Sequence, residues 1–336
     1  GPGFDSMWTD MSEIVRPTRD GIHGREYIST CVDIGRKLPH LTFDGGRLSV
    51  DPPPLAEIPL PVIFDLLPRH WRRGPVVPAV AAAAAELGTM AVLGESDFRE
   101  IPASVRGRAI PFLSVPSAMA APRERSAPIV MIPDGPGVSA AQASLKRDLP
   151  AGIVAVRVPA GPDTAERAAE LARDGTDVIH LVFDRHGREQ GGHTRRHLRD
   201  VLRDTHTALV RSGIRDEVTL IASGGIAAAE HVAKAVICGA DLVAIDVPLI
   251  LALECRLCGE CRSGKPCPVA LEEIDAGFCV RRIVNLMSAW HSQLLEMLGA
   301  MGIREVRRLR GETGRCMFFE DLERDTFGRL FGKRKS

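Results

Sequence analysis

The sequence lacks several features that would place it in a broad class of protein. It has no excess of charge, because Lys plus Arg equals Asp plus Glu at 43 each, so the electrostatic signature of a nucleic-acid-binding protein is missing. No apolar run approaches the roughly 18 residues needed to cross a bilayer. The first ten residues, GPGFDSMWTD, contain no basic region followed by an apolar stretch, which excludes a typical signal peptide. We therefore expect a chain that binds no nucleic acid and spans no membrane.

The chain also lacks an initiator methionine, which predicts a fragment or a processed product. Its 336 residues suffice for one large domain, and the hydrophobic (45%) and charged (26%) fractions are typical of globular proteins. The eight cysteines are not spaced like a disulfide framework, since four of them fall between residues 255 and 267. We therefore expect a cytoplasmic protein.

From about residue 60, short aliphatic runs alternate with alanine-rich helical stretches. Continuous apolar runs predict strands that are buried on both faces, and hence a parallel sheet. Eight such strands favour an α/β fold with a closed (β/α)8 barrel of the TIM type over an open doubly wound sheet, which the pattern alone does not exclude. Strands two to five follow one another within about 20 residues, so we expect a trimmed first half. The eight runs are residues 61–64, 89–93, 109–114, 128–132, 152–158, 177–183, 217–223 and 241–246.

Four segments follow from this pattern. Residues 1–57 are rich in proline, glycine and charge and form an N-terminal extension. The barrel is predicted over 58–253, and a cysteine-rich loop follows its eighth strand over 254–272. A helical period then predicts a C-terminal helical segment over 273–336.

A candidate phosphate site lies at the end of the seventh predicted strand, where Ser223, Gly224 and Gly225 precede a helix. Glycines let backbone N–H groups approach a ligand closely, and a helix N-terminus favours an anion. The alternative is that the glycine pair only makes a tight turn. Asp246-Val247-Pro248, which ends the eighth predicted strand, argues against phosphate, because a carboxylate repels phosphate and proline has no N–H donor.

The stretch ECRLCGECRSGKPCPV has the spacing Cys255-x2-Cys258-x2-Cys261-x5-Cys267, with Pro268 next. Two-residue gaps let successive thiolates converge on one small inorganic core, and a Cys-Pro ending is found in ferredoxin-type cluster runs. Four cysteines can also close a tetrahedral zinc site, although zinc sites usually pair two separate Cys-x2-Cys knuckles. The spacing favours an iron–sulfur cluster over zinc, and zinc over free structural thiols.

In this region the chain resembles the FMN-binding, iron–sulfur domain of the glutamate synthase large subunit. GIRDEVTLIASGGI, GADLVAIDVPLILALECRLC and CPVAL stand in the family's order, with Gly-Gly after strand seven and cysteines after strand eight. RRIVNL and LGAMGIREVRRLRG are similar to its C-terminal helices, and residues 13–37 are similar to a segment that precedes the barrel in some relatives.

The resemblance implies a flavin oxidoreductase acting on CH–NH2 donors, with FMN at the barrel mouth beside a cluster. In the family, electrons pass through the flavin to reduce 2-iminoglutarate to glutamate. Three cysteines hold a three-iron cluster there, and their counterparts are Cys255, Cys261 and Cys267. The additional Cys258 makes a four-iron cluster the alternative to 3Fe-4S. Gly224 and Gly225 carry over to the flavin phosphate site, next to Ser223. The resemblance also implies a redox partner subunit or domain, a separate glutaminase subunit, and an oligomer or complex.

The substrate and flavin loops depart from the family. Its Asn-Thr-Gly-Glu-Gly-Gly loop is replaced by residues 92–97, and its lysine-bearing mid-barrel loop has no counterpart. The loop after strand six offers Asp184, His186 and His193 as candidate proton donors, although each is more often a solvated loop residue. The alternative function is a non-catalytic, barrel-shaped iron–sulfur electron-transfer or scaffold subunit that has lost flavin and substrate binding. A third is a zinc-stabilised binding module.

Overall fold

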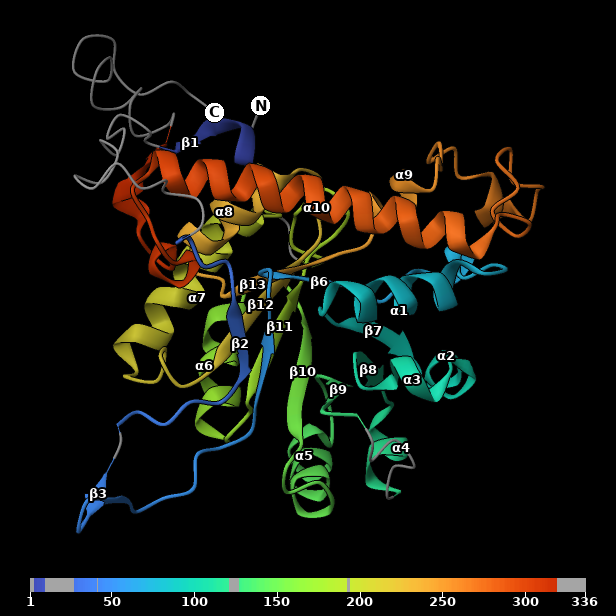
Figure 1. Ribbon diagram of the computed structural model, residues 1–336. Coiled ribbons are helices and arrows are strands. Elements are labelled where there is room, and N and C mark those ends of the chain that lie inside the picture. Colours follow the sequence, from blue (N-terminus) through green and yellow to red (C-terminus); the bar gives the residue numbers. More distant parts are fainter. Residues whose placement is uncertain (1–2, 10–26, 41, 121–126, 192–193, 319–336) are drawn as a thin grey trace, which may run out of the picture.

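The computed structural model describes residues 3–9, 27–40, 42–120, 127–191 and 194–318. Eight parallel strands close into a barrel in the spatial order β10-β11-β12-β13-β6-β7-β8-β9, which confirms the predicted TIM-type fold (Figure 1). Nearly every strand residue is buried, because the barrel interior and the surrounding helices cover both faces. The strands are β6 (Val62–Phe64), β7 (Ala91–Gly94), β8 (Ala109–Phe112), β9 (Ile129–Pro133), β10 (Ile153–Pro159), β11 (Val178–Val182), β12 (Thr219–Ser223) and β13 (Leu242–Ile245).

The crossover helices differ in length between the two halves of the barrel. The connections after β7 and β8 contain only short helices of six, four and five residues, which agrees with the expected trimming of the first half. The connections after β9, β10 and β11 contain full helices that bury one apolar face. The helices are α1 (Val76–Leu87), α2 (Glu95–Glu100), α3 (Ala103–Arg106), α4 (Val115–Met119), α5 (Val138–Asp148), α6 (Thr164–Arg173), α7 (Leu198–Arg211), α8 (Ala229–Ile237) and α9 (Val247–Ala252).

The N-terminal part of the chain packs against the end of the barrel where the strands begin. Strands β2 (Val32–Gly35) and β5 (Leu55–Ile58) form an antiparallel pair, and the backbone N–H of Gly35 donates to Oγ1 of Thr219 at 3.0 Å. Because Thr219 is the first residue of β12, this pair covers the end of the barrel opposite the cysteine loop. Between these strands, β3 (Phe43–Asp44) and β4 (Arg47–Leu48) form a hairpin that projects from the body of the protein (Figure 1).

The C-terminal part begins with one long helix, α10 (Ala276–Ala300), which crosses the outside of the barrel beside α1, α8 and α9 (Figure 1). Its buried residues recur every three or four positions, which is the spacing of one helix face. They are Cys279, Ile283, Met287, Trp290, Leu294 and Leu298. After α10 the chain forms the 3-10 turns η4 (Val306–Leu309) and η5 (Thr313–Arg315). It then forms the strand β14 (Cys316–Phe318), which pairs with β1 (Met7–Thr9).

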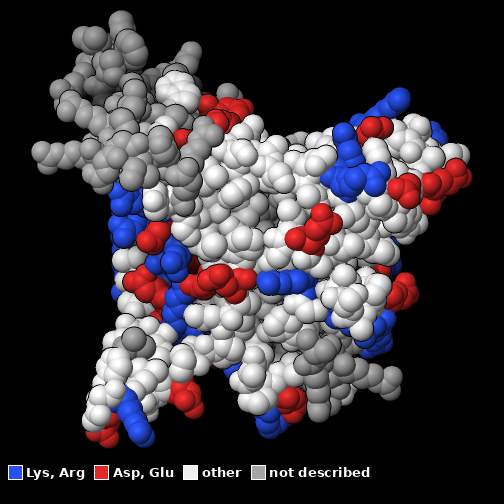
Figure 2. Space-filling view, viewed as in Figure 1, with Lys and Arg blue, Asp and Glu red and all other residues white. Residues whose placement is uncertain are grey.

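The surface agrees with the balanced charge of the sequence. On the face seen in Figure 2, basic and acidic side chains lie interspersed rather than gathered by sign. Within the described ranges, no helix is both long enough and apolar enough to cross a membrane.

Candidate functional site

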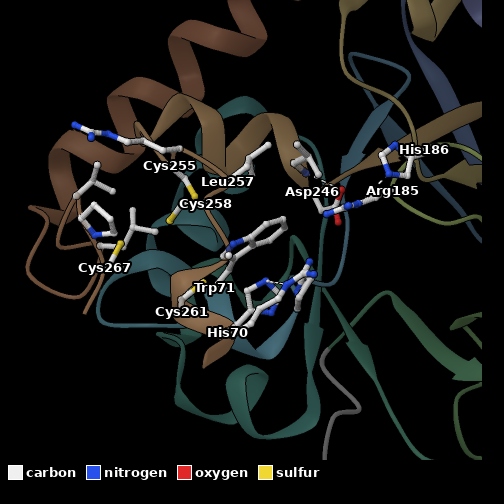
Figure 3. A pocket seen from close by; sticks show the side chains of 18 residues that line it. His70, Trp71, Arg185, His186, Asp246, Cys255, Leu257, Cys258, Cys261 and Cys267 are labelled. Carbon is white, nitrogen blue, oxygen red and sulfur yellow. Dashed lines mark hydrogen bonds between the residues drawn. The ribbon is translucent and has the colours of Figure 1, made fainter. Parts of the chain in front are cut away.

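The candidate site is a trough at the end of the barrel where the strands finish. It consists of two cavities that share Arg185, His186, Asp246 and Val247. We call the first, of about 490 Å³, the thiol pocket, because all four cysteines of residues 255–267 border it (Figure 3). We call the second, of about 420 Å³, the glycine pocket, because Gly225 and the two residues after it border it. The trough thus joins the two regions that the sequence singled out.

The backbone after α9 folds the four cysteines around the thiol pocket. Glu254 and Leu257 take positive φ angles of 68° and 50°, and Gly259 and Gly264 are left-handed as well, so the chain reverses direction repeatedly over a short span. Cys255 is buried, Cys261 and Cys267 are partly buried, and Cys258 is exposed. His70 and Trp71, from the 3-10 turn η2 (Arg69–Trp71), form the facing wall (Figure 3). Arg73 ties the loop to this wall, since its guanidinium donates to the Cys261 carbonyl at 3.2 Å.

All four thiols border one pocket, and cysteine thiolates are the usual ligands of iron–sulfur clusters. Burial raises the pKa of the Cys255 thiol, and the neighbouring thiols of Cys267, Cys261 and Cys258 raise it further. Among the residues that the structure describes, however, no three His, Cys, Asp or Glu side chains are arranged closely enough to hold a single metal ion. The iron–sulfur assignment of these four cysteines therefore stays a prediction.

Gly224 and Gly225 have a structural reason to be glycine. Their φ angles are 98° and 71°, and a Cβ at either position would lie 2.5 Å from the backbone of the loop after β11, at the carbonyl oxygen of Asp184 and the nitrogen of Gly187. The glycine pair therefore lets this loop pack directly on the end of β12. In the described part of the chain, the N–H groups of Gly225 and Ile226 donate to no protein acceptor.

The glycine pocket is lined by cationic and imidazole side chains. Arg185, His186, Arg188 and His197 all border it, and they come from the loop after β11 and the start of α7. Nδ1 of His197 accepts the N–H of Arg199 at 3.2 Å and so caps α7. Burial and the charge of Arg199 together lower the pKa of His197 to about 4, so this imidazole is neutral at pH 7. Arginines and unpaired N–H groups are donors that suit an anion.

The three predicted proton donors have different places. The Asp184 carboxylate organises its own loop, since Oδ1 accepts the N–H groups of His186 and Arg188, both at 2.8 Å, and Oδ2 pairs with Arg195 at 2.6 Å. Burial opposes ionisation of Asp184, but these hydrogen bonds outweigh it and lower its pKa. Asp184 borders neither pocket, whereas His186 borders both. His193 lies outside the described residues.

A buried polar chain runs beneath the trough, and sequence reasoning missed all of it except Ser223. Arg157 on β10 donates two hydrogen bonds to Asp65, at 2.5 and 3.0 Å, and a third to Nδ1 of His180 at 3.2 Å. Nε2 of His180 then bonds to Oγ of Ser223 at 2.9 Å. Ser223 is therefore held inside the barrel and borders neither pocket. The sequence does contain a sign of this buried polar chain, because Arg157 and His180 are polar residues within otherwise apolar runs.

Two pKa values in this region move in opposite directions. Burial opposes ionisation of Asp65, but the charge and hydrogen bonds of Arg157 outweigh it and lower its pKa to about 2. Asp246, at the end of β13, has no such partner. Burial and the nearby charge of Asp65 together raise the pKa of Asp246 to about 6. Oδ1 of Asp246 accepts the N–H of Val247 at 2.6 Å, so its carboxyl group caps α9.

Comparison with solved structures supports the fold. A flavocytochrome b2 variant with pyruvate bound superposes with a TM-score of 0.58 at 12% identity, covering 99% of this chain and 83% of that one. A mandelate oxidase variant superposes with a TM-score of 0.55 at 16% identity, covering 90% of this chain and 97% of that one. At these identities the likeness establishes a shared barrel architecture and nothing further.

Comparison of sequences identifies the relatives. The model of a conserved region in glutamate synthase matches residues 198–304. The archaeal glutamate synthase [NADPH] of Methanocaldococcus jannaschii is 39% identical over 114 residues, which are 32% of this chain and 22% of that protein. The protein of the same name from Archaeoglobus fulgidus is 31% identical, and the match covers 52% of this chain and 37% of that one.

These two matches span well under half of either relative. A longer match, to the archaeal-type glutamate synthase [NADPH] of Dehalococcoides mccartyi, covers 92% of this chain and 73% of that protein at 25% identity. The chain is therefore related to the glutamate synthases, and the region that it shares with them most clearly runs from α7 into the turns after α10.

Proposed function

We propose that the chain is a glutamate synthase-type oxidoreductase domain that binds FMN in the trough beside an iron–sulfur cluster on Cys255, Cys258, Cys261 and Cys267. One observation carries this proposal: two cavities of different chemistry are joined through four shared residues. An elongated ligand with an apolar end and an anionic end would match both cavities at once. FMN, which has a flat ring system at one end and a phosphate at the other, is such a ligand.

The glycine pocket would receive the phosphate. Arg185 and Arg188 border it, and the N–H groups of Gly225 and Ile226 lie beside them without a protein acceptor in the described residues. A phosphate oxygen accepts hydrogen bonds from guanidinium and backbone N–H groups alike, and charge-assisted bonds of this kind are the stronger ones. The resemblance likewise assigns Gly224 and Gly225, in the turn after β12, to the flavin phosphate site.

The thiol pocket would receive the ring. Trp71, Leu257, Val269 and Leu271 give it apolar walls, and the four thiols lie along the same cavity. When bound, FMN would supply redox chemistry in one- and two-electron steps, and a cluster here would be its immediate neighbour. The residues of the chain would then hold the two centres next to one another and exclude water between them.

The substrate and partners follow from the relatives. Because the relatives are named glutamate synthases [NADPH], we propose glutamate formation as the reaction. The resemblance implies a redox partner subunit or domain that supplies electrons, and we propose such a partner for this chain. A separate glutaminase subunit would supply ammonia within an oligomer or complex. We also propose the cytoplasm as the compartment, because four of the eight cysteines fall between residues 255 and 267 and are not spaced like a disulfide framework.

A second candidate function is an iron–sulfur scaffold subunit without flavin. It is favoured by the direct packing of the loop after β11 on Gly224 and Gly225, which explains the glycines without a ligand. The position of Asp246, a carboxylate between the two pockets, favours it as well. In this case the trough would stay empty, and the cysteine loop alone would carry the function.

Anaerobic purification followed by flavin, iron and sulfide analysis tests the proposal. We expect a brown protein that releases FMN on denaturation. Arg188→Gln should weaken FMN binding by about one to two orders of magnitude, since one charge-assisted hydrogen bond contributes about 1.5–3 kcal/mol. Binding of riboflavin, which has no phosphate, should stay unaffected. Arg211→Gln, which removes an exposed arginine at the far end of α7, is the control. A brown protein that neither contains nor binds FMN would favour the scaffold, and a colourless zinc protein would overturn both candidates.

A further inference from the structure

The glycine pocket contains a group that is unusual for an anion site. Asp246 borders this pocket and the thiol pocket, and it stands between them together with Arg185, His186 and Val247. Figure 3 shows its carboxyl group beside Arg185, on the side of the thiol pocket away from the cysteines. A phosphate bound near Gly225 would therefore lie in the same cavity as a carboxyl group. Two like charges in one partly buried cavity repel each other, since little water screens them.

The charged surroundings of Asp246 do not neutralise it. Its own helix, α9, contributes no charged side chain. Asp65 and Arg157 face it from the barrel interior, where they are already paired with one another. The loop after β11 contributes Arg185 and His186 along the walls of the trough. The remaining charged or titratable groups around the two pockets are Arg188, His197, His70, Arg256, Arg262 and the thiols of Cys255, Cys258, Cys261 and Cys267.

Asp246 is consequently easier to protonate than an ordinary aspartate. Burial of its carboxyl group and the charge of Asp65 raise its pKa to about 6, whereas the hydrogen bond from Val247 only partly offsets the rise. A negative ligand in the same cavity would raise this pKa further, for the same Coulombic reason. Ligand binding and proton binding would therefore favour one another, as linkage requires.

We propose that Asp246 couples binding of the phosphate end of FMN to uptake of one proton from solvent, so that the trough binds its ligand with this carboxyl group neutral. The inference rests on the proposed function, because it takes FMN as the ligand of the trough. Below the range in which Asp246 ionises, the phosphate meets a neutral carboxyl group. Above this pH range the carboxylate of Asp246 is charged, so FMN either binds together with a proton or binds next to the negative charge. In both cases the affinity for FMN falls. Asp246 would thus act as a specificity determinant between phosphate-ended and neutral ligands.

The test compares the wild-type protein with Asp246→Asn, using FMN and riboflavin as probes at pH 5 and pH 8. At pH 8 we expect Asp246→Asn to bind FMN about tenfold more tightly than the wild type, the effect of about one pKa unit of interaction. At pH 5 the two proteins should bind FMN equally. Comparing the proteins at each pH cancels the titration of the FMN phosphate and of the histidines, which both proteins share. Riboflavin should show no difference between the two proteins at either pH.

Controls separate this coupling from other effects. Asparagine keeps a side-chain oxygen that can accept the Val247 N–H, and Asp246→Ser also provides a helix cap, so at least one variant should keep the fold. Glu86→Gln removes an exposed carboxylate on α1 and should behave as the wild type at both pH values.

The possible failures are distinct. If the ratio of the FMN affinities of the two proteins is the same at pH 5 and pH 8, the coupling is wrong while the FMN site stands. The same holds if the variant binds FMN more weakly than the wild type at pH 8. If neither protein binds FMN at any pH, the proposed function fails and the coupling fails with it.

Discussion

Arg157 and Asp65 meet across the barrel. Arg157 lies on β10 and Asp65 directly follows β6, and three strands separate these two on either side of the barrel. The guanidinium donates to both carboxylate oxygens, at 2.5 and 3.0 Å, and Phe112 lies within 5.9 Å of the guanidinium carbon. Since opposite walls contribute the two charges, this pair spans the barrel interior.

Removing one member of this pair should cost far more stability than removing both. Arg157→Met would leave the Asp65 carboxylate, which is 5% exposed, buried without a counter-charge. We expect a loss of about 3–5 kcal/mol in the free energy of unfolding, whereas the double variant Asp65→Asn, Arg157→Met should lose much less. Urea denaturation of the three proteins measures the difference. Equal losses for the single and double variants would mean that the pair is not a coupled unit.

The pH dependence of stability should report on His180. Arg157 donates to its Nδ1, so the proton resides on Nε2, which donates to Ser223. Burial and the charge of Arg157 together lower the pKa of His180 to about 3. Between pH 6.5 and 3 the unfolded state therefore binds more protons than the folded state, and stability falls as pH decreases through this range.

His180→Gln removes the titrating group while keeping a donor and an acceptor. The variant should lose part of the acid sensitivity, up to about 1.4 kcal/mol per pH unit, which corresponds to one proton. His40→Gln, which removes an exposed imidazole, is the matched control and should keep the wild-type slope. Urea midpoints measured between pH 4 and pH 7 give the slopes. An unchanged slope in His180→Gln would show that this imidazole does not titrate as its burial requires.

The barrel could be predicted from the sequence because each of its strands has a recognisable apolar pattern of its own. Runs such as residues 128–132 are apolar throughout, and a strand buried on both faces needs that pattern wherever it lies in the chain. The pairing of Arg157 with Asp65 was not predictable, because the two residues are 92 positions apart and meet only when the barrel closes.

The sequence also could not distinguish between the two possible roles of the glycine pair Gly224-Gly225. Close packing of a neighbouring backbone and close approach of a phosphate both require glycine, so the residue type does not tell which of the two applies. Only the position of the loop after β11 shows that the first reason already holds at Gly224 and Gly225. Likewise, the carboxylate of Asp184 resembles a catalytic group in the sequence, and its hydrogen bonds to its own loop become visible only in the structure.

Gly225→Ala should disrupt the glycine pocket through backbone contact. An added Cβ would lie 2.5 Å from the nitrogen and 2.6 Å from the Cα of Gly187, neither of which can rotate away. Gly213 is a suitable control, since its φ of 70° matches the 71° of Gly225 and a Cβ there meets nothing within 4 Å. Gly213→Ala should cost about 1–2 kcal/mol from left-handed strain alone.

We expect Gly225→Ala to cost at least about 1–3 kcal/mol more than Gly213→Ala, because the loop after β11 must move as well. It should also abolish FMN binding. Thermal unfolding and flavin titration of both variants provide the comparison. If the two substitutions have the same effect on stability, the loop does not pack on Gly225 as the structure describes.

Substitution of single cysteines should distinguish the two proposed cluster types. Cys261→Ser removes a thiol that both the three-cysteine and the four-cysteine assignments require, so its iron content should fall below that of the wild type in either case. Cys258 is the exposed member and belongs only to the four-cysteine assignment. In a four-iron centre, Cys258→Ser should therefore lower the iron content from about four to about three atoms per chain, since each thiolate ligates one iron. In a three-iron centre the same substitution should change nothing.

Cys31→Ser is the matched control, because Cys31 is a partly buried thiol far from the loop in sequence and does not border the thiol pocket. It should keep the full iron and sulfide content of the wild-type protein. Colorimetric iron and sulfide assays on anaerobically purified protein, together with the visible spectrum, measure all three variants. Full iron content in Cys261→Ser would contradict the ligand assignment, and zinc in place of iron in the wild type would remove the cluster altogether.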